Sequence, residues 1–135
     1  MSAPRLAPEQ QERLLAAARG ARERAYAPYS HFRVGAAVLT HEGSVYRGCN
    51  VENASYGLTI CAERSAIFAA VAAEGPGMKL RAIAVSADHE PPCSPCGACR
   101  QVIAEFGYDA VVLFYGESGL QQVLIQDLLP ETFRL

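Results

Sequence analysis

The sequence predicts a single α/β domain built around a mixed β-sheet. The chain has 135 residues, which suits one domain and is long enough to bury a core without disulfides. Half of the residues are hydrophobic and 19% are charged, an ordinary globular mixture. Along the chain, a strand hairpin is followed by a helix, a strand, a helix and a strand, an order typical of a layered α/β fold. We expect residues 1–135 to form one domain.

The first elements expected are a helix and a hairpin. A helix is predicted from about Pro8 to Ala25, because proline suits its first turn and three apolar residues follow at helical spacing: Leu14, Leu15 and Ala18. Two apolar, partly β-branched stretches then run from Arg33 to Thr40 and from Ser44 to Val51. Glu42 and Gly43 between them predict a tight turn, so these stretches are expected to pair as a hairpin.

The second half predicts a buried helix, a strand, a second helix and a last strand. The buried helix is expected from Thr59 to Glu74, with apolar residues on its tightly packed faces: Ala62, Ala66, Ile67, Ala69, Ala70 and Ala73. Gly75, Pro76 and Gly77 end it. A strand is then expected from Leu80 to Ser86 and another from Ala110 to Tyr115. The helix between them is expected from Cys96 to Phe106 and is closed by Gly107.

Charge and hydropathy argue against two classes of partner. The formal net charge of −2 disfavours nucleic acid, because phosphate binding favours a dense basic surface. No apolar run is long enough to span a bilayer, and the first five residues, Met1 to Arg5, lack the apolar stretch of a signal peptide. We therefore expect a cytoplasmic protein. Its odd number of cysteines, five, argues against a disulfide framework.

The spacing of three cysteines predicts a metal site. Cys96 and Cys99 form a Cys-x-x-Cys pair at the start of one predicted helix, and Cys61 lies near the start of another. Thiolates bind metals, and the partial positive charge at a helix N-terminus favours the thiolate form. Soft sulfur ligands at this spacing favour zinc over magnesium or calcium. Three protein ligands leave the fourth position of a tetrahedral ion open to water, as in catalytic zinc sites.

Two residues beside Cys61 have the chemistry to serve such a site. Glu63 lies two residues further on, where its carboxylate can take a proton from the metal-bound water and deliver it to a substrate and a leaving ammonia. Three thiolates on Zn²⁺ leave a net charge of about −1, which opposes ionisation of that water. Arg64, one helical turn after Cys61, can donate hydrogen bonds to the sulfurs and offset this charge.

The sequence leaves a structural zinc site open as an alternative. Cys93 precedes Cys96 by three residues, so Cys61, Cys93, Cys96 and Cys99 can also be read as a closed four-cysteine site. A closed site would stabilise the fold of a non-enzymatic domain and would not activate water. Cys49 has no partner at metal-binding spacing and is expected to be a small core residue.

The chain resembles the homotetrameric zinc-dependent cytidine deaminases. The matching segments follow the order of the family over nearly the whole chain: 29–37 (YSHFRVGAA), 48–57 (GCNVENASYG), 59–64 (TICAER), 95–101 (PCGACRQ), and Leu128, Leu129 and Pro130 with Phe133. The resemblance implies a three-layer α/β/α fold with a mixed five-stranded sheet, assembled as a homotetramer that shares its active sites between subunits. It also implies one zinc per subunit on Cys61, Cys96 and Cys99, with Glu63 as the proton shuttle.

The resemblance further implies how the substrate is held. Phe32 would pack on the nucleoside, and Asn50 and Glu52 would hydrogen-bond the ribose 3′-hydroxyl; the two flank Val51, so strand geometry places them on one face. Residues from neighbouring subunits would complete the site: Ala54 and Tyr56 near the ribose, and Phe133 on the pyrimidine.

The implied reaction is the hydrolysis of cytidine or 2′-deoxycytidine to uridine or 2′-deoxyuridine and ammonia, as used in pyrimidine salvage. Zinc-bound hydroxide would attack C4 while Glu63 protonates N3 and then the amine. A deaminase of a modified cytosine nucleoside, such as blasticidin S, is an alternative, but Asn50-x-Glu52 and the run from Tyr56 to Thr59 favour cytidine. Editing of a polynucleotide is disfavoured by the short acidic chain, which predicts no basic groove.

Overall fold

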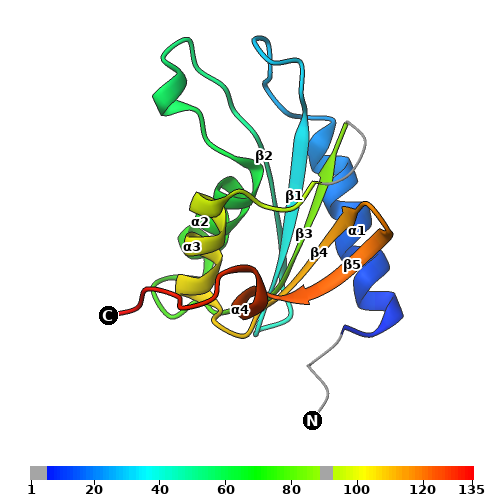
Figure 1. Ribbon diagram of the computed structural model, residues 1–135, viewed down its shortest axis with the longest axis vertical. Helices are drawn as coiled ribbons and strands as arrows, with labels where there is room; N and C mark the ends of the chain where they lie inside the picture. Colours follow the sequence, from blue (N-terminus) through cyan, green and yellow to red (C-terminus); the bar gives the residue numbers. More distant parts are fainter. Residues whose placement is uncertain (1–5, 89–92) are drawn as a thin grey trace.

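A computed structural model of the chain describes residues 6–88 and 93–135, and its elements form three layers (Figure 1). Residues 1–5, where no signal peptide is expected, and residues 89–92 lie outside the described part. The elements, in chain order, are α1 (Pro8–Arg22), β1 (Val34–Thr40), β2 (Val45–Cys49), the 3-10 helix η1 (Tyr56–Leu58), α2 (Ala62–Glu74), β3 (Leu80–Ala87), α3 (Gly97–Phe106), β4 (Val111–Gly116), β5 (Gly119–Leu124) and α4 (Ile125–Leu128).

The central sheet is mixed and has five strands in the order β2-β1-β3-β4-β5, which confirms the fold class expected from the sequence. Strands β1 and β2 form the predicted antiparallel hairpin, with Gly43 in its turn at a φ of 89°. Strand β3 pairs antiparallel with β1 and parallel with β4, while β5 returns antiparallel beside β4. The one parallel pair has α3 between its strands in sequence, as a parallel connection requires.

Successive residues of a strand point to opposite faces of the sheet and pack in two separate hydrophobic cores. Ala36 and Val38 of β1 pack on the side of α2 and α3, whereas Ala37 and Leu39 of the same strand pack on the side of α1. This alternation follows from the two-residue period of a strand. The sheet is therefore the middle layer, with α1 on one face and α2 and α3 on the other (Figure 1).

Several elements and burials differ from those expected. Helix α2 begins at Ala62 rather than Thr59, because Ile60 forms an isolated β-bridge with Val51. Helix α1 ends at Arg22, and strand β5 and helix α4 were not foreseen from the residues. On α2, Ala69 and Ala73 are exposed rather than packed. Cys49 is half-buried, and its thiol lies 3.5 Å from the carbonyl oxygen of Arg24.

The placement of α2 depends on a close approach to β2 at Gly48. A Cβ atom at this position would lie 2.3 Å from the backbone nitrogen of Ala66 and 2.8 Å from the carbonyl oxygen of Ala62. Glycine therefore lets the first turns of α2 rest directly on the strand. As a result, the N-terminus of α2, which carries Cys61, is fixed relative to the sheet.

Two loops rise beyond the strand ends and form an upper lobe of the molecule, residues 23–33 and 50–61 (Figure 1). Isolated bridges join Tyr26 to Val51 and Val51 to Ile60, so the two loops are tied together at their bases. The described helices include none with the length and apolar character needed to cross a membrane.

Candidate metal centre and substrate cavity

The three predicted ligands come together where α2 and α3 both begin. Cys61 is the N-cap of α2, Cys96 is the N-cap of α3, and Cys99 lies in the first turn of α3. Their sulfur atoms all lie within 4.8 Å of one another. One ion can reach three sulfurs at this spacing, since a zinc–sulfur bond is about 2.3 Å long. The donor set fits zinc, because soft thiolates select it over hard cations.

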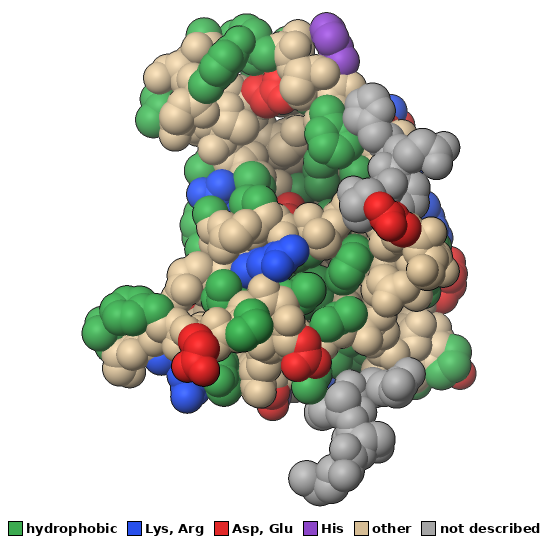
Figure 2. Space-filling view, in the orientation of Figure 1, with side chains coloured by type: hydrophobic (Ala, Val, Ile, Leu, Met, Phe, Trp, Pro, Cys, Tyr) green, Lys and Arg blue, Asp and Glu red, His purple; other side chains and the backbone are tan. Residues whose placement is uncertain are grey.

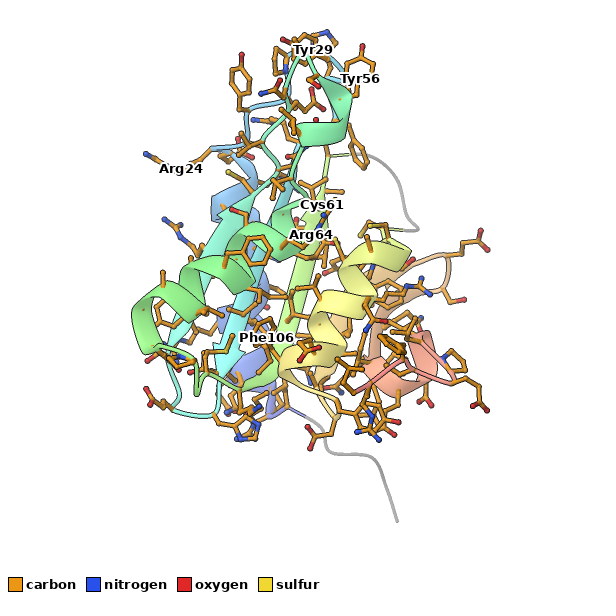
Figure 3. The ribbon with its side chains drawn as sticks, turned by 90° about the vertical axis from the view of Figure 1, so that its left-hand side faces the viewer. Arg24, Tyr29, Tyr56, Cys61, Arg64 and Phe106 are labelled. Carbon is orange, nitrogen blue, oxygen red and sulfur yellow. The ribbon has the colours of Figure 1, made fainter. Side chains whose placement is uncertain are left out.

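The charges around the sulfurs favour the thiolate at Cys61. A hydrogen bond from the Cys99 thiol and one from the Arg64 guanidinium lower the pKa of Cys61, whereas the hydrogen bond with Cys61 and burial raise the pKa of Cys99. Arg64 Nη2 donates to the Cys61 sulfur at 3.2 Å, and this contact raises the pKa of Arg64 (Figure 3). The contact is the one expected from the three-residue spacing, and it puts a fixed positive charge beside the sulfurs.

Glu63 lies beside the cysteine cluster in a nearly dry environment. Only 5% of its surface is exposed, and it is the second residue of α2. Burial raises the pKa of its carboxyl group, and hydrogen bonds from its own backbone N–H and from the Cys99 thiol offset this only in part. A carboxyl group with a raised pKa is suited to accept and return a proton near neutral pH.

A cavity of about 400 Å³ opens from the cysteine cluster toward the upper lobe. Its walls include Phe32, Asn50 and Glu52 from the two lobe loops, Cys61, Ala62 and Glu63 from the start of α2, and Cys93, Ser94 and Cys96 before α3. Figure 2 shows the lobe overhanging the body of the molecule, with a recess beneath it. The volume suits a small molecule, and the few polar groups among apolar walls are typical of a ligand site.

Phe32 and Asn50 are placed together at this cavity. Asn50 is 9% exposed; its side-chain amide donates to the carbonyl oxygen of Phe32 at 2.8 Å and accepts from the backbone N–H of Val34 at 2.8 Å. One N–H and one lone pair of this amide remain for a substrate hydroxyl. Phe32 lines the cavity, and 36% of its surface is exposed.

Glu52 faces the same cavity and is held by the segment before Phe32. Its carboxylate accepts from the backbone N–H of Tyr29 at 2.9 Å, the backbone N–H of Ser30 at 3.1 Å and the Ser30 hydroxyl. The Ser30 hydroxyl bond is the main cause of a lowered pKa at Glu52, so the group is a carboxylate at neutral pH. Ser30 and Thr59 also line the cavity, and sequence reasoning gave them no role although both lie in the matched segments.

Three predicted substrate residues lie outside this cavity within the single chain. Ala54 is exposed, and Tyr56 is 76% exposed at the tip of the lobe, where its ring lies edge-on to Tyr29 with centroids 6.1 Å apart (Figure 3). Phe133 is 70% exposed on the C-terminal tail, and Gln101 holds its carbonyl oxygen at 3.1 Å. None of the three is among the described residues that line the cavity around Cys61.

Cys93 is not part of the cysteine cluster. Among the described residues, the group that can hold a metal consists of Cys61, Cys96 and Cys99. The Cys93 thiol lies 3.6 Å from the carbonyl oxygen of Tyr115, and its backbone N–H donates to that same oxygen at 3.0 Å. The geometry therefore favours a three-ligand site over the closed four-cysteine alternative.

Arg100 is a supporting residue that sequence reasoning did not single out. Its guanidinium donates to the carbonyl oxygens of Pro95 at 2.8 Å and Leu128 at 2.9 Å. It thereby ties the residue before Cys96 to the end of α4. The only sequence signal was its place directly after Cys99 in a matched segment.

Comparisons with known proteins agree with this geometry. A family model described as the cytidine and deoxycytidylate deaminase zinc-binding region matches residues 8–115. The chain is 50% identical over 125 residues to a cytidine deaminase of Sporosarcina psychrophila, covering 90% of each protein. It is 52% identical over 115 residues to one from Halalkalibacterium halodurans, covering 84% of this chain and 86% of the relative.

Solved structures show the same likeness in three dimensions. The crystal structure of cytidine deaminase from Burkholderia pseudomallei superposes with a TM-score of 0.83 at 50% identity, covering 90% of this chain and 98% of that one. Cytidine deaminase from Mycobacterium tuberculosis gives a TM-score of 0.81 at 42% identity, covering 93% of this chain and 98% of that one. The likeness thus extends over nearly the full length of each neighbour.

Proposed function

The chain belongs to the family of zinc-binding cytidine and deoxycytidylate deaminases, and we propose that it hydrolyses free cytidine and 2′-deoxycytidine to the corresponding uridines and ammonia. It is a zinc-dependent deaminase by family. The observation that carries the proposal is the meeting of three cysteine sulfurs and a buried Glu63 at one end of a nucleoside-sized cavity. A role in pyrimidine salvage follows from such a substrate.

Glu63 is proposed as the proton shuttle. Zinc held by Cys61, Cys96 and Cys99 supplies the Lewis acid that activates water for attack on C4. The Glu63 carboxylate takes a proton from the attacking water and passes it to N3 of the ring. It then takes the remaining proton from the new C4 hydroxyl and delivers it to the departing amino group. Ammonia leaves and the C4 carbonyl of uridine forms, so atoms and charges balance. Burial raises the pKa of Glu63 toward neutral, so the group can both accept and donate a proton.

The other cavity residues are proposed to orient the nucleoside. Phe32 offers an aromatic face for the substrate, while Asn50 and Glu52 offer a donor and acceptors to the ribose 3′-hydroxyl. Because these contacts concern the 3′ side of the sugar, they accept ribose and deoxyribose alike. An absence of deoxycytidine turnover would contradict this sugar model.

We also propose that the active enzyme is a cytoplasmic homotetramer with shared sites. The support is that Ala54, Tyr56 and Phe133 are exposed and do not line their own chain's cavity, so a second copy can use them. Five free cysteines suit a reducing compartment. Sedimentation of the purified protein tests the assembly, and a fully active monomer would contradict it.

The test of the function is conversion of nucleosides followed by ultraviolet absorbance. Purified protein with a measured zinc content is given cytidine, 2′-deoxycytidine and blasticidin S in parallel. We expect turnover of the first two, with release of one ammonia per nucleoside. If only blasticidin S were converted, the modified-nucleoside alternative would replace the proposal; if the zinc-loaded protein converted none, the deaminase proposal itself would fail.

Replacing Arg64 with glutamine tests the charge balance at the sulfurs. The change removes the guanidinium that donates to Cys61 at 3.2 Å and leaves the thiolate charge uncompensated. Because losses of groups that hydrogen-bond metal ligands typically cost about 10- to 100-fold in activity or metal affinity, we expect kcat to fall by that order and the pH–rate profile to shift. Arg13→Gln, an exposed residue of α1, is the matched control. An Arg64→Gln enzyme with unaltered rate and pH profile would exclude this role.

A further inference from the structure

A group of four charged side chains lies at the end of the sheet beside the substrate cavity, and Arg33 and Asp88 form its centre. Arg33 Nε donates to Oδ2 of Asp88 at 2.8 Å, and Nη2 donates to Oδ1 at 3.2 Å. The backbone N–H of Arg33 also donates to Oδ2 at 3.1 Å, and the backbone N–H of Asp88 donates to the Arg33 carbonyl at 3.0 Å. Four hydrogen bonds thus join two residues that are 55 positions apart.

The end of α1 supplies the other two charges. Glu23 accepts from Arg33 Nη1 at 3.2 Å, and Arg22 Nε lies 3.6 Å from the Asp88 carboxylate. Arg22 Nη1 also donates to the Ser86 hydroxyl and the Ala87 carbonyl. A single exposed ion pair contributes little, but a two-pronged arginine–carboxylate pair within a network is the geometry in which such pairs do contribute. The Arg33 guanidinium accordingly lowers the pKa of Asp88.

Asp88 binds the backbone of Arg33, and the two neighbouring residues, Phe32 and Val34, are held by Asn50. The Asn50 amide bonds the Phe32 carbonyl and the Val34 N–H, while Asp88 bonds the N–H and the carbonyl of Arg33 between them. Alternate backbone groups of an extended segment point to opposite sides. Asn50 and Asp88 therefore hold the same three residues from two sides, directly after the point where Phe32 lines the cavity.

The chain reaches Phe32 through an unfavourable conformation. His31 has a φ of 57°, in the left-handed region that non-glycine residues rarely adopt. The Phe32 N–H then donates back to the Ser30 hydroxyl at 3.0 Å. The turn at His31 and the hydrogen bonds to residues 32–34 thus hold the backbone from which the Phe32 ring projects.

We propose that the Arg33–Asp88 pair is a positioning element that fixes Phe32 for contact with the nucleoside, without touching the substrate itself. The inference rests on the proposed substrate contact of Phe32. Aromatic contacts contribute roughly 2- to 10-fold in affinity beyond burial. Loss of the pair therefore raises KM for cytidine by about that factor and leaves kcat nearly unchanged.

The kinetic test is a cycle of Asp88→Ala, Phe32→Ala and the double variant. We expect Asp88→Ala to raise KM in the wild-type background and to have no further effect once Phe32 is alanine. Asp88→Asn, which keeps an acceptor oxygen, should restore part of the loss. Glu12→Ala, which breaks an exposed 2.9 Å ion pair with Arg19 on α1, serves as the control. An equal KM effect of Asp88→Ala in both backgrounds, or none in either, would overturn the proposal.

A second measurement does not depend on activity. The chain contains no tryptophan, so Phe32→Trp introduces a single fluorescent reporter at the cavity. We expect Asp88→Ala to lower the fluorescence anisotropy of this reporter and shift its emission to the red in substrate-free protein. A reporter at Phe68, which is 49% exposed on α2, should not respond. Unchanged anisotropy at position 32 would overturn the positioning role even if the enzyme deaminates cytidine. A lowered anisotropy would support the positioning role even if the substrate proved to be a different molecule.

Discussion

Replacing Glu63 with glutamine is expected to lower kcat for cytidine by about 10²- to 10⁴-fold while the protein keeps its zinc, because a positioned proton donor and acceptor contributes by that order. Glutamine has nearly the shape of glutamate, so the buried position, 5% exposed, stays filled. It cannot take a proton from water or return one to the ring. The measurement is the ultraviolet assay beside a zinc determination on the same sample.

The control for this variant makes the same substitution at a residue away from the cavity. Glu105→Gln makes the same change at an exposed residue of α3, away from the cavity, and should leave kcat unaltered. A Glu63→Gln protein that retains zinc and turns over cytidine within about threefold of the wild-type rate, a difference of less than 1 kcal/mol in the barrier, would exclude Glu63 as the shuttle.

The layered fold was predictable wherever the local pattern was strong. The hairpin at Gly43, the helix stopped by Gly75 and the helix closed by Gly107 all follow from turn and cap residues. Strand β5 was missed because Gly119, Gln121 and Gln122 give it neither an apolar run nor a clear alternation. It is an edge strand without a fully buried residue, and its pairing with β4 rather than its own residues decides its conformation.

The clustering of Cys61, Cys96 and Cys99 was predictable from their spacing, whereas the cavity wall was not. Cys96 and Cys99 belong to one helix start, so their proximity follows from the sequence alone, and Arg64 reaches Cys61 because the two are one helical turn apart. By contrast, the bond between Arg33 and Asp88 spans 55 residues and depends on the register of β1 with β3. A contact between residues of two distant strands cannot be predicted from the residues near either one in the sequence.

Asn50 illustrates the same limit at a predicted site residue. The family resemblance implies that Asn50 faces the substrate, and Asn50 does line the cavity. Its main bonds, however, are to the backbone of residues 32 and 34. An asparagine can hold the wall of a cavity or bind the ligand. The sequence is the same in both cases, so only the fold shows which groups its amide bonds.

Replacing Cys99 with alanine is expected to remove both zinc and activity, whereas replacing Cys93 with alanine is expected to preserve both. Cys99 is fully buried, and its sulfur is one of three that lie within 4.8 Å of one another. With one of the three sulfurs removed, the remaining two cysteines would hold zinc much more weakly. Bound zinc should fall from about one per chain toward none, and thermal stability should fall with it, because metal binding to the native state adds to stability.

The Cys93 variant turns this pair into a test between a catalytic and a structural site. The Cys93 thiol lies at the Tyr115 carbonyl rather than in the cluster, so its loss removes one weak hydrogen bond and a small wall contact. If Cys93→Ala lost zinc as fully as Cys99→Ala, four sulfurs would hold the ion and no position would remain for the water that deamination requires. Retention of zinc and turnover in Cys93→Ala, together with their loss in Cys99→Ala, is the result that a three-thiolate catalytic centre demands.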